Sequence, residues 1–360
     1  MYAKSGTGVR LKTAPGLRAR RAFHPAYESM KDCTMRRREL NILLGTAVAY
    51  PFAARAQQQA TPVIGFLHAA SPEQNVERLA SYRKGLSDAG FVEGQNVTIT
   101  FRWAEGHADR LPEMAADLIR RQVAVIATAG STDAALAAKS ATSTIPIVFG
   151  AGGDPVTLGL VTSLNRPGGN VTGVTSMNAD IAAKRLGLLR ELAPQATRYF
   201  ALVNPTSVLA DPFIKELQAG AAKLGIHAEL LHASNDAAID AAFAQVPHQS
   251  ATVLVVNTDA FFFSRRTEIA RRALDQQLPT MFDNREYAAA GGLVSYGADF
   301  LNVMQSAGVY TGRILRGEKP ADLPVMQSTK YEFVINLKTA KSLGIKVSDN
   351  LLSLADETIE

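Results

Sequence analysis

PVIGFLHAASPEQNVERLASYRKGLSDAG, the sequence of residues 62–90, changes its hydrophobic pattern once along its length. The apolar run at residues 62–67 is predicted to form a buried strand. Residues 73–89 carry apolar side chains at helical spacing, and Gly90 supplies a helix stop. Residues 96–101 then alternate between apolar and polar side chains, which predicts a second strand. Residues 62–101 therefore predict a strand, a helix and another strand in succession.

The same alternation continues along the chain. Further strands are predicted at residues 123–128, 145–149, 199–203, 228–232, 252–256 and 279–282. Further helices are predicted at residues 108–121, 132–140, 180–193, 212–224, 237–245 and 265–276, and from Arg285. Strands that are apolar throughout and alternate with crossover helices are typical of parallel sheets covered on both faces. About ten strands in two such stretches predict an α/β protein with two doubly wound parallel sheets.

Composition agrees with a folded chain of this size. The 360 residues correspond to about two domains, and 47% hydrophobic with 20% charged residues is enough to bury sizeable cores. Residues 1–56 hold 11 basic and 3 acidic residues, which leaves 27 basic and 30 acidic residues for the rest. The body is therefore mildly acidic, and its single tryptophan, Trp103, gives no sign of a stacking surface for nucleic acid. We expect no nucleic-acid partner.

Residues 57–360 lack the sequence motifs of catalysis and metal binding. The only cysteine, Cys33, precedes them, which excludes a disulfide, a zinc–cysteine cluster or a cysteine nucleophile there. Gly150-Ala151-Gly152 lacks the third glycine of a dinucleotide fingerprint because residue 155 is proline. The sequence also lacks a phosphate-loop Gly-Lys-Ser/Thr and a Gly-x-Ser-x-Gly elbow. We expect a protein that is not an enzyme and has no catalytic residue, no metal site and no cofactor.

Residues 36–56 carry the three parts of an export signal. Arg36-Arg37-Arg38 is a basic region, residues 42–49 are an apolar region, and Ala54-Arg55-Ala56 is a cleavage site of small residues. The apolar region is too short for a membrane span of about 20 residues. We predict cleavage after Ala56, with Gln57 as the new N-terminus.

The start of translation and the export route are inferred from the same region. Met35 begins a signal of ordinary length, so we expect translation to start there and residues 1–56 to be an extension plus a cleaved signal. Arg37-Arg38-Glu39-Leu40 resembles the twin-arginine pattern, and general export is equally allowed. No cysteine follows the cleavage site, so we expect no lipid anchor. The predicted location is the periplasm, as an exported soluble protein.

Polar residues gather where the predicted strands end. In doubly wound sheets, ligands bind beyond the carboxyl ends of the strands. The candidate ligand-binding residues at these ends are Ser71, Ser131, Thr132, Asp154, Thr175, Asn204, Asn257, Asp259, Tyr296 and Asp299. Hydroxyls and amides at helix N-termini with nearby carboxylates suit a small polar or zwitterionic ligand. At each position, the alternative that the residue only caps a helix stays open.

Two expectations concern particular charged groups of the ligand. Ser131 and Thr132 start a predicted helix, whose N–H groups we expect to hold a ligand carboxylate. At least one of Asp154, Asp259 and Asp299 should face a cationic or hydroxyl group of the ligand, because a buried carboxylate needs a partner. Aromatic side chains near the strand ends either line an apolar pocket or pack in the core; they are Phe66, Phe261, Phe262, Phe263 and Tyr296.

The chain resembles the ABC-transporter substrate-binding proteins of the type that includes bacterial tryptophan- and tyrosine-binding proteins. The resemblance extends from Met35 to Glu360, and its landmarks occur in one order. They are Gly65-Phe66-Leu67, Gly90 to Val97, Ile145 to Phe149, Asp154-Pro155-Val156, Gly159-Leu160-Val161, Arg166 to Gly173, Arg285-Glu286-Tyr287, Gly291 to Gly297 and Val334 to Ala340. These landmarks indicate the family and leave the ligand open.

The resemblance implies a fold like that of the type I periplasmic binding proteins, with two lobes joined by a multi-strand hinge. The chain would cross between lobes near Thr175, near Tyr296-Gly297 and near residues 323–325. The N-lobe would comprise residues 60–175 and 298–324, and the C-lobe residues 176–297 and 325–360. The lobes would close around a ligand in the cleft between them.

The resemblance also implies the function of a periplasmic solute-binding protein of an ABC importer. Its small-molecule ligand would be an amino acid or a related small organic acid, its partner a permease in the inner membrane, and its state a monomer. One alternative is a sensory or regulatory ligand-binding domain of the same fold, although a cytoplasmic regulator would carry a helix-turn-helix where this chain has an export signal. The other alternative is an exported α/β enzyme, which the missing catalytic motifs disfavour.

Overall fold

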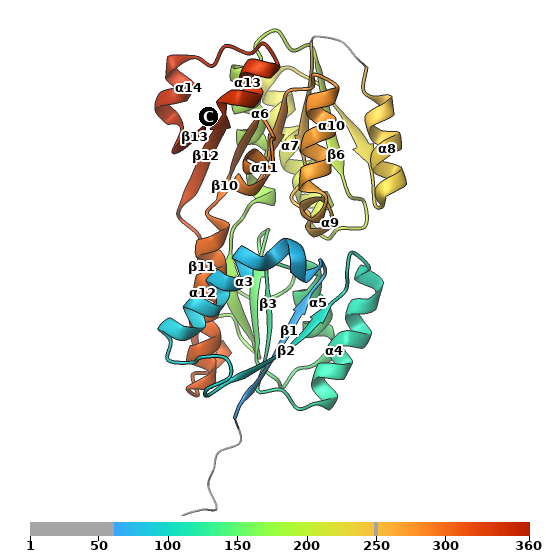
Figure 1. Cartoon of the computed structure of the whole chain (residues 1–360). Helices are drawn as coiled ribbons and strands as arrows, with labels where there is room; N and C mark the ends of the chain where they lie inside the picture. The colour runs from blue at the N-terminus through green and yellow to red at the C-terminus, as the bar shows by residue number, and fades with distance from the viewer. Residues whose placement is uncertain (1–60, 248–250) are drawn as a thin grey trace, which may run out of the picture. The chain divides into compact units, whose positions relative to one another are not determined.

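The computed structural model describes residues 61–247 and 251–360, so the interpretation of residues 1–56 lies outside the described residues. Two α/β lobes, each built on its own sheet, make up the described part (Figure 1). The first lobe has a six-stranded sheet in the order β11-β5-β4-β3-β1-β2, and the second lobe has a seven-stranded sheet in the order β13-β12-β10-β9-β8-β6-β7. The predicted α/β class with two doubly wound lobes is confirmed.

The strands of the first lobe include two that the sequence analysis does not predict, β5 and β11. The six strands are β1 (Val63–His68), β2 (Thr98–Trp103), β3 (Val125–Ala129), β4 (Ile147–Ala151), β5 (Val171–Thr175) and β11 (Met326–Gln327). All neighbours in this sheet are parallel. In β5, a Cβ on Gly173 would lie 2.2 Å from the backbone oxygen of Phe149, its pairing partner in β4. Only glycine permits this close pairing, and the same glycine weakens the strand pattern in the sequence.

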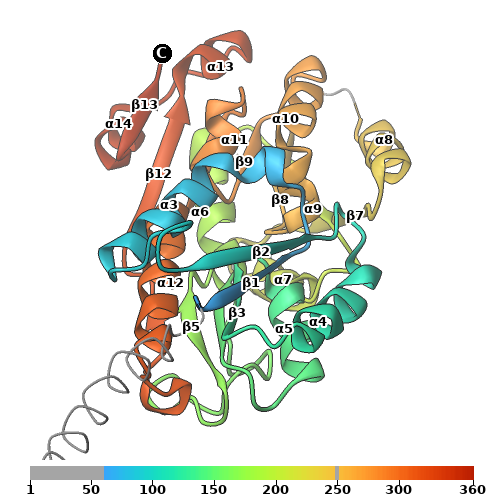
Figure 2. The ribbon, with the colours of Figure 1, turned by 60° about the horizontal axis from the view of Figure 1, so that its bottom comes forward.

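The helices that cover the first sheet come from both ends of the described chain. They are η1 (Pro72–Asn75), α3 (Val76–Asp88), η2 (Ala108–Arg110), α4 (Leu111–Arg120), α5 (Thr132–Ala141), α12 (Phe300–Leu315) and η4 (Pro320–Asp322). Helix α12, which the sequence analysis does not predict, packs against α3 from far along the chain (Figures 1 and 2). A Cβ on Gly85 of α3 would lie 1.8 Å from the backbone oxygen of Gln305, and a Cβ on Gly308 of α12 would lie 2.1 Å from that of Tyr82. The two helix backbones therefore touch directly.

The second sheet is mixed, because its two last strands, β12 and β13, run parallel to each other and antiparallel to the rest of the sheet. Its strands are β6 (Arg198–Val203), β7 (Ala228–His232), β8 (Thr252–Val256), β9 (Thr280–Phe282), β10 (Val294–Ala298), β12 (Tyr331–Asn336) and β13 (Glu357–Ile359). Strand β12 is antiparallel to β10 and pairs Val294 with Ile335. The predicted parallel arrangement holds for the rest of the sheet, and the pairing of β12 with β10 is the one difference within the described residues. The chain enters β12 directly from the first lobe, without the crossover helix that a parallel strand needs.

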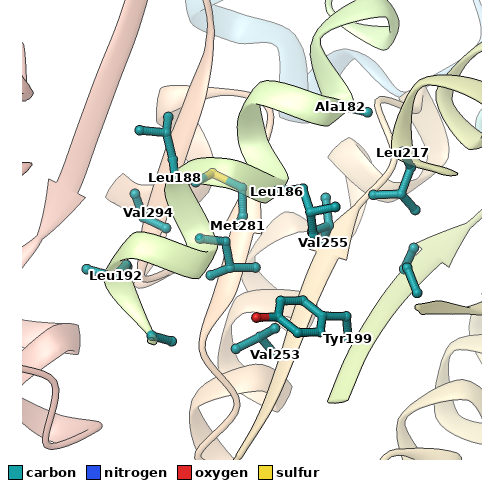
Figure 3. Close-up of a cluster of buried hydrophobic side chains, with 14 of the residues drawn as sticks. Ala182, Leu186, Leu188, Leu192, Tyr199, Leu217, Val253, Val255, Met281 and Val294 are labelled. Carbon is teal, nitrogen blue, oxygen red and sulfur yellow. The ribbon is translucent and has the colours of Figure 1, made fainter. Parts of the chain in front are cut away.

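The helices of the second lobe pack mostly on the parallel part of its sheet. They are η3 (Ala179–Ile181), α6 (Ala182–Leu192), α7 (Ala210–Leu224), α8 (Asp236–Gln245), α9 (Ala260–Ser264), α10 (Arg266–Asp275), α11 (Arg285–Ala289), α13 (Leu337–Ser342) and α14 (Asp349–Leu354). Figure 3 shows leucines of α6, such as Leu186 and Leu192, against strand side chains that include Val255 and Met281. All four are buried. Burial of each of these side chains stabilises the folded state by about 1.5–3 kcal/mol. This packing holds the sheet, and therefore the loops at the ends of its strands, in a fixed position.

Three chain segments pass between the lobes, and hydrogen bonds tie them to each other. They are residues 176–178, Asp299 and residues 328–330, which follow β5, β10 and β11. The Asn178 Oδ1 atom accepts from the backbone N–H of Ala298 at 2.9 Å, and the backbone N–H of Asp299 donates to the oxygen of Lys330 at 3.0 Å. The Tyr331 hydroxyl donates to the backbone oxygen of Ser176 at 3.2 Å.

The last of these segments lies slightly later than the sequence analysis places it. Met326 and Gln327 pair with β5 in the first sheet, whereas the sequence analysis assigns residues from 325 onward to the second lobe. A two-residue edge strand has no period to detect, so the sequence offers no signal for it.

Candidate functional site

Two small cavities lie between the lobes, where the loops after several strands meet. Cavity A is lined by polar residues that include Arg78, Thr132, Thr258, Asp259, Asp283 and Asn284. Cavity B is lined by polar residues that include Asp133, Asn204, Thr206, Ser207, Ser234 and Asp259. Each has a volume of about 40 Å³, which is room for a few water molecules. Asp259 and Ala260 line both cavities, so the two are adjacent.

The strand ends bring three of the ten candidate residues to these cavities. Thr132 follows β3, Asn204 follows β6 and Asp259 follows β8, each within a few residues of the carboxyl end of its strand. This placement agrees with the rule that ligands bind at that edge of parallel sheets. Contact of these residues with a ligand stays a prediction.

Three other candidates are buried near the cavities and bonded within the protein. The Ser131 Oγ atom accepts from the backbone N–H of Ala134 and so caps α5. The Thr175 hydroxyl donates to the backbone oxygen of Gly153 at 2.8 Å. The Asn257 amide is directed toward the backbone oxygen of Leu209 at 3.4 Å. These bonds hold the loops around the site in place.

The remaining candidates lie outside both cavities. Ser71 precedes η1 without a side-chain cap bond, and Asp154 forms a turn with the backbone N–H of Val156 and the hydroxyl of Thr157. Asp299 caps α12 and pairs with Lys330 at 2.8 Å. Tyr296 stacks on Tyr331 with ring centroids 6.0 Å apart, beside the segments that join the lobes.

Two of the aromatic side chains near the strand ends reach the site. Phe261 lines cavity B and Phe263 lines cavity A, whereas Phe66 and Phe262 are buried in the hydrophobic cores of their lobes.

The Thr132 side chain is bonded within the first lobe, because its Oγ1 atom accepts from the backbone N–H of Gly152 at 3.0 Å. The hydroxyl therefore joins two loops of the first lobe at the wall of cavity A.

Arg78 bridges the lobes, and sequence analysis misses it. It projects from α3 of the first lobe and donates from Nε to Glu286 of the second lobe at 2.9 Å. Its guanidinium carbon lies 3.3 Å from the ring centroid of Phe263 and 4.0 Å from that of Phe300, so the cation is held between two rings. Burial alone would raise the pKa of Glu286, but the charge and hydrogen bond of Arg78 outweigh it and lower that pKa.

Buried polar atoms without a hydrogen-bond partner gather around cavity A. Within residues 61–247 and 251–360 they include Arg78 Nη2, both carboxylate oxygens of Asp283, and Asn284 Oδ1. Asp283 is 1% exposed, and its burial raises its pKa although the charges of Arg185 and Arg78 oppose the shift. Buried polar groups are nearly always hydrogen-bonded, so these atoms indicate where a ligand would bond. A guanidinium donor and a free carboxylate together complement a carboxylate and an ammonium group.

A second pair of carboxylates meets at cavity B. Asp259 caps α9 through the backbone N–H of Phe262 at 2.9 Å and accepts from Asn204 Nδ2 at 3.1 Å. Burial, and to a lesser extent the nearby carboxylate of Asp133, raise the pKa of Asp259 to about 6. Burial also raises the pKa of Asp133, whose carboxylate accepts from the backbone N–H of Val208 of the other lobe at 3.4 Å.

We expect the free energy of unfolding to decrease as the pH rises from 4.5 to 7.5, by about 2 kcal/mol through Asp259. The folded state holds a proton on Asp259 up to a pH of about 6, whereas the unfolded chain releases it near its ordinary pKa of 3.8. The folded state therefore binds more protons in this range and loses stability as they leave. Urea unfolding of wild type and Asp259→Asn at both pH values measures the difference. Identical pH dependence in the two proteins would contradict the prediction.

Sequence signals exist for only some of the residues that sequence analysis misses. Asp283 and Asn284 directly follow the predicted strand at 279–282, so the rule applied to the other strand ends would have found them. Asp133 lies next to two candidates. Arg78 lies inside a helix and resembles any exposed helical arginine, so only the tertiary structure reveals it.

The described residues form neither a membrane-spanning helix nor a cluster of metal ligands. No helix in that part of the chain is long and apolar enough to cross a membrane. Nor do the described residues contain a group of three or more His, Cys, Asp or Glu side chains arranged to hold a metal ion.

Comparison with known proteins assigns the family. Residues 68–359 match the family model described as ABC transporter substrate binding protein. The tyrosine-binding protein of Clostridioides difficile (strain R20291) is 29% identical over 264 residues, which are 73% of this chain and 75% of that protein.

Solved structures agree in fold. A conserved domain protein from Vibrio cholerae has a TM-score of 0.77 at 26% identity, covering 83% of this chain and 100% of that one. An ABC domain from Streptococcus pneumonia in complex with L-Trp has a TM-score of 0.74 at 26% identity, with the same coverage. The ligand-free, open structure of a substrate-binding protein with adhesive properties from Clostridium difficile has a TM-score of 0.60 at 25% identity, covering 83% and 99%. Given the match to the family model over most of its length, this chain belongs to the ABC transporter substrate-binding protein family.

Proposed function

We propose that this chain is the periplasmic solute-binding protein of an ABC importer and that it binds an amino acid or a related small organic acid between its lobes. The observation that carries the proposal is the set of buried polar atoms around cavity A that have no hydrogen-bond partner among the described residues, above all Arg78 Nη2 and the Asp283 carboxylate. An α-amino acid presents a carboxylate to the first and an ammonium group to the second. The relatives whose names include tyrosine binding and an L-Trp complex support this ligand class.

Closure of the two lobes around the ligand would be the working step. The contacts of Arg78 with Glu286 and of Asp133 with Val208 join the two lobes, and opening of the cleft would break them. A ligand that bonds to both lobes binds the closed form better, so its differential affinity drives closure. The higher TM-score against the L-Trp complex than against the ligand-free, open relative agrees with a closed arrangement here. A permease in the inner membrane would then receive the loaded, monomeric form.

A thermal-shift screen over amino acids, aromatic acids and small organic acids tests the proposal. A ligand at 100 times its Kd stabilises the folded state by about 2.7 kcal/mol, which appears as a higher melting temperature. Titration calorimetry then gives the Kd, and mass spectrometry shows whether the compound is returned unchanged. Chemical conversion of the compound, or the absence of any stabilising compound, would contradict a binding protein of this class.

We expect saturating ligand to reduce the radius of gyration modestly in small-angle X-ray scattering. The reason is that three chain segments between the lobes permit bending, while the ligand favours the shut cleft. The control is a compound that gives no thermal shift. An unchanged radius of gyration at saturation would contradict the hinge motion.

A further inference from the structure

Cavity B differs from cavity A in having acidic groups from both lobes and no basic partner. Asp133 lies in the first turn of α5 in the first lobe, and Asp259 caps α9 in the second lobe. Among the described residues, no lysine or arginine lines this cavity. Their hydrogen bonds come from two backbone N–H groups and from the Asn204 amide, all of them neutral. The negative charge of the pair is therefore not balanced by the protein.

Cavity A does not supply the missing positive charge. Among the described residues that line it, Arg78 is the one basic residue, and it is paired with the partly buried Glu286. Burial raises the pKa of Asp283, and the charge of the fully buried Arg185 opposes this rise, but Arg185 donates to the backbone oxygens of Tyr296 and Asn178 rather than to a carboxylate of either cavity. Three carboxylates thus line the adjacent cavities, opposite one guanidinium that already has an acidic partner.

Lobe closure makes this charge arrangement costly without a cation. The hydrogen bond from Val208 to Asp133 shows that the closed lobes bring the two acidic residues to the same cavity. Like charges that are buried in a protein repel each other more strongly than in bulk water. A positive group between them converts repulsion into attraction, and it does so only when the cleft is shut. Such a group would favour the closed form.

We propose that the ligand carries a positively charged group that binds in cavity B between Asp133 and Asp259, so that this protein prefers basic amino acids to neutral ones. The inference rests on the proposed function, since it names the ligand class of the same cleft. A basic amino acid places its ammonium and carboxylate at Asp283 and Arg78 and its side-chain cation at cavity B.

Titration calorimetry with L-lysine and L-arginine against L-leucine, L-tyrosine and L-tryptophan tests this ligand class on the wild-type protein. We expect a Kd at least tenfold lower for the basic amino acids. Binding of neutral amino acids with equal or higher affinity overturns this inference and leaves the proposed function standing. If neither set binds, this inference is overturned, and the thermal-shift screen over aromatic and small organic acids decides the proposed function separately.

A pair of variants tests the position of the cation. Asp133→Asn should weaken binding of L-lysine at least tenfold, because the amide cannot pair with the side-chain ammonium. The exposed Asp109→Asn, which changes the net charge equally, should leave the affinity unchanged. Thermal unfolding checks that both variants fold, and the wild-type comparison stands without them. An unchanged affinity for L-lysine in folded Asp133→Asn overturns the assignment of cavity B.

Discussion

Replacing Asp283 with alanine is expected to weaken binding of any amino acid that stabilises the wild type by a factor of about 30 to 1,000, or about 2–4 kcal/mol. Both carboxylate oxygens of Asp283 are buried at cavity A, and neither has a partner within the described residues. The ligand ammonium would form its charge-assisted hydrogen bonds there, and alanine leaves that ammonium desolvated and without a partner. Titration calorimetry of wild type and variant measures the loss.

The stability of the variant separates lost contact from misfolding. Burial raises the pKa of Asp283, so its ionised form is held in the folded state at a cost. The melting temperature without ligand should therefore not fall in Asp283→Ala. Ser71→Ala serves as a binding control, because the Ser71 side chain lies outside both cavities. A Kd within threefold of the wild type would refute the role of Asp283.

Alanine at Gly85 or Gly308 is expected to lower the free energy of unfolding by about 3 kcal/mol or more. The added methyl group would lie 1.8 Å or 2.1 Å from a backbone oxygen of the facing helix, far inside van der Waals contact. No side chain can rotate away to relieve the clash, so α3 and α12 must separate along the first lobe. Such a loss exceeds the gain of about 1 kcal/mol that alanine brings to a helix interior.

Gly187→Ala in α6 is the matched control for this prediction. It makes the same substitution inside a helix, but a Cβ there would meet no atom within 4 Å. This variant should therefore be as stable as the wild type or more stable, by up to about 1 kcal/mol. Chemical unfolding of the three variants gives the comparison. Equal stabilities for Gly85→Ala, Gly308→Ala and Gly187→Ala would show that the helices do not touch through these glycines.

The sequence alone is sufficient to predict the fold wherever buried apolar residues recur at the regular spacing of a strand or a helix. Apolar strands alternating with amphipathic helices predict two doubly wound sheets, and this is confirmed because both faces of each parallel strand must be covered. The pattern fails for β11 and β12. The first is too short to show a period, and the direction of the second depends on how the chain crosses between lobes. Helix α12 does have apolar residues at helical spacing, so the sequence contains the signal for this helix although it is not among the predicted helices.

For the site, the sequence alone determines that polar groups follow the strands, because parallel strands end at one edge of a sheet. It cannot determine which of these groups remain free of structural bonds. Ser131 and Thr132 look like ligand contacts in the sequence, yet their side-chain oxygens accept bonds from backbone N–H groups.

The tertiary structure decides the charges of the cleft, because they come from elements far apart in sequence. Arg78 meets Glu286, and Asp133 meets Asp259, only when the two lobes face each other. Burial then changes what each group can do, since a carboxylate removed from water needs a new partner. No local pattern of residues encodes that juxtaposition, so the ligand class has to be inferred from the fold.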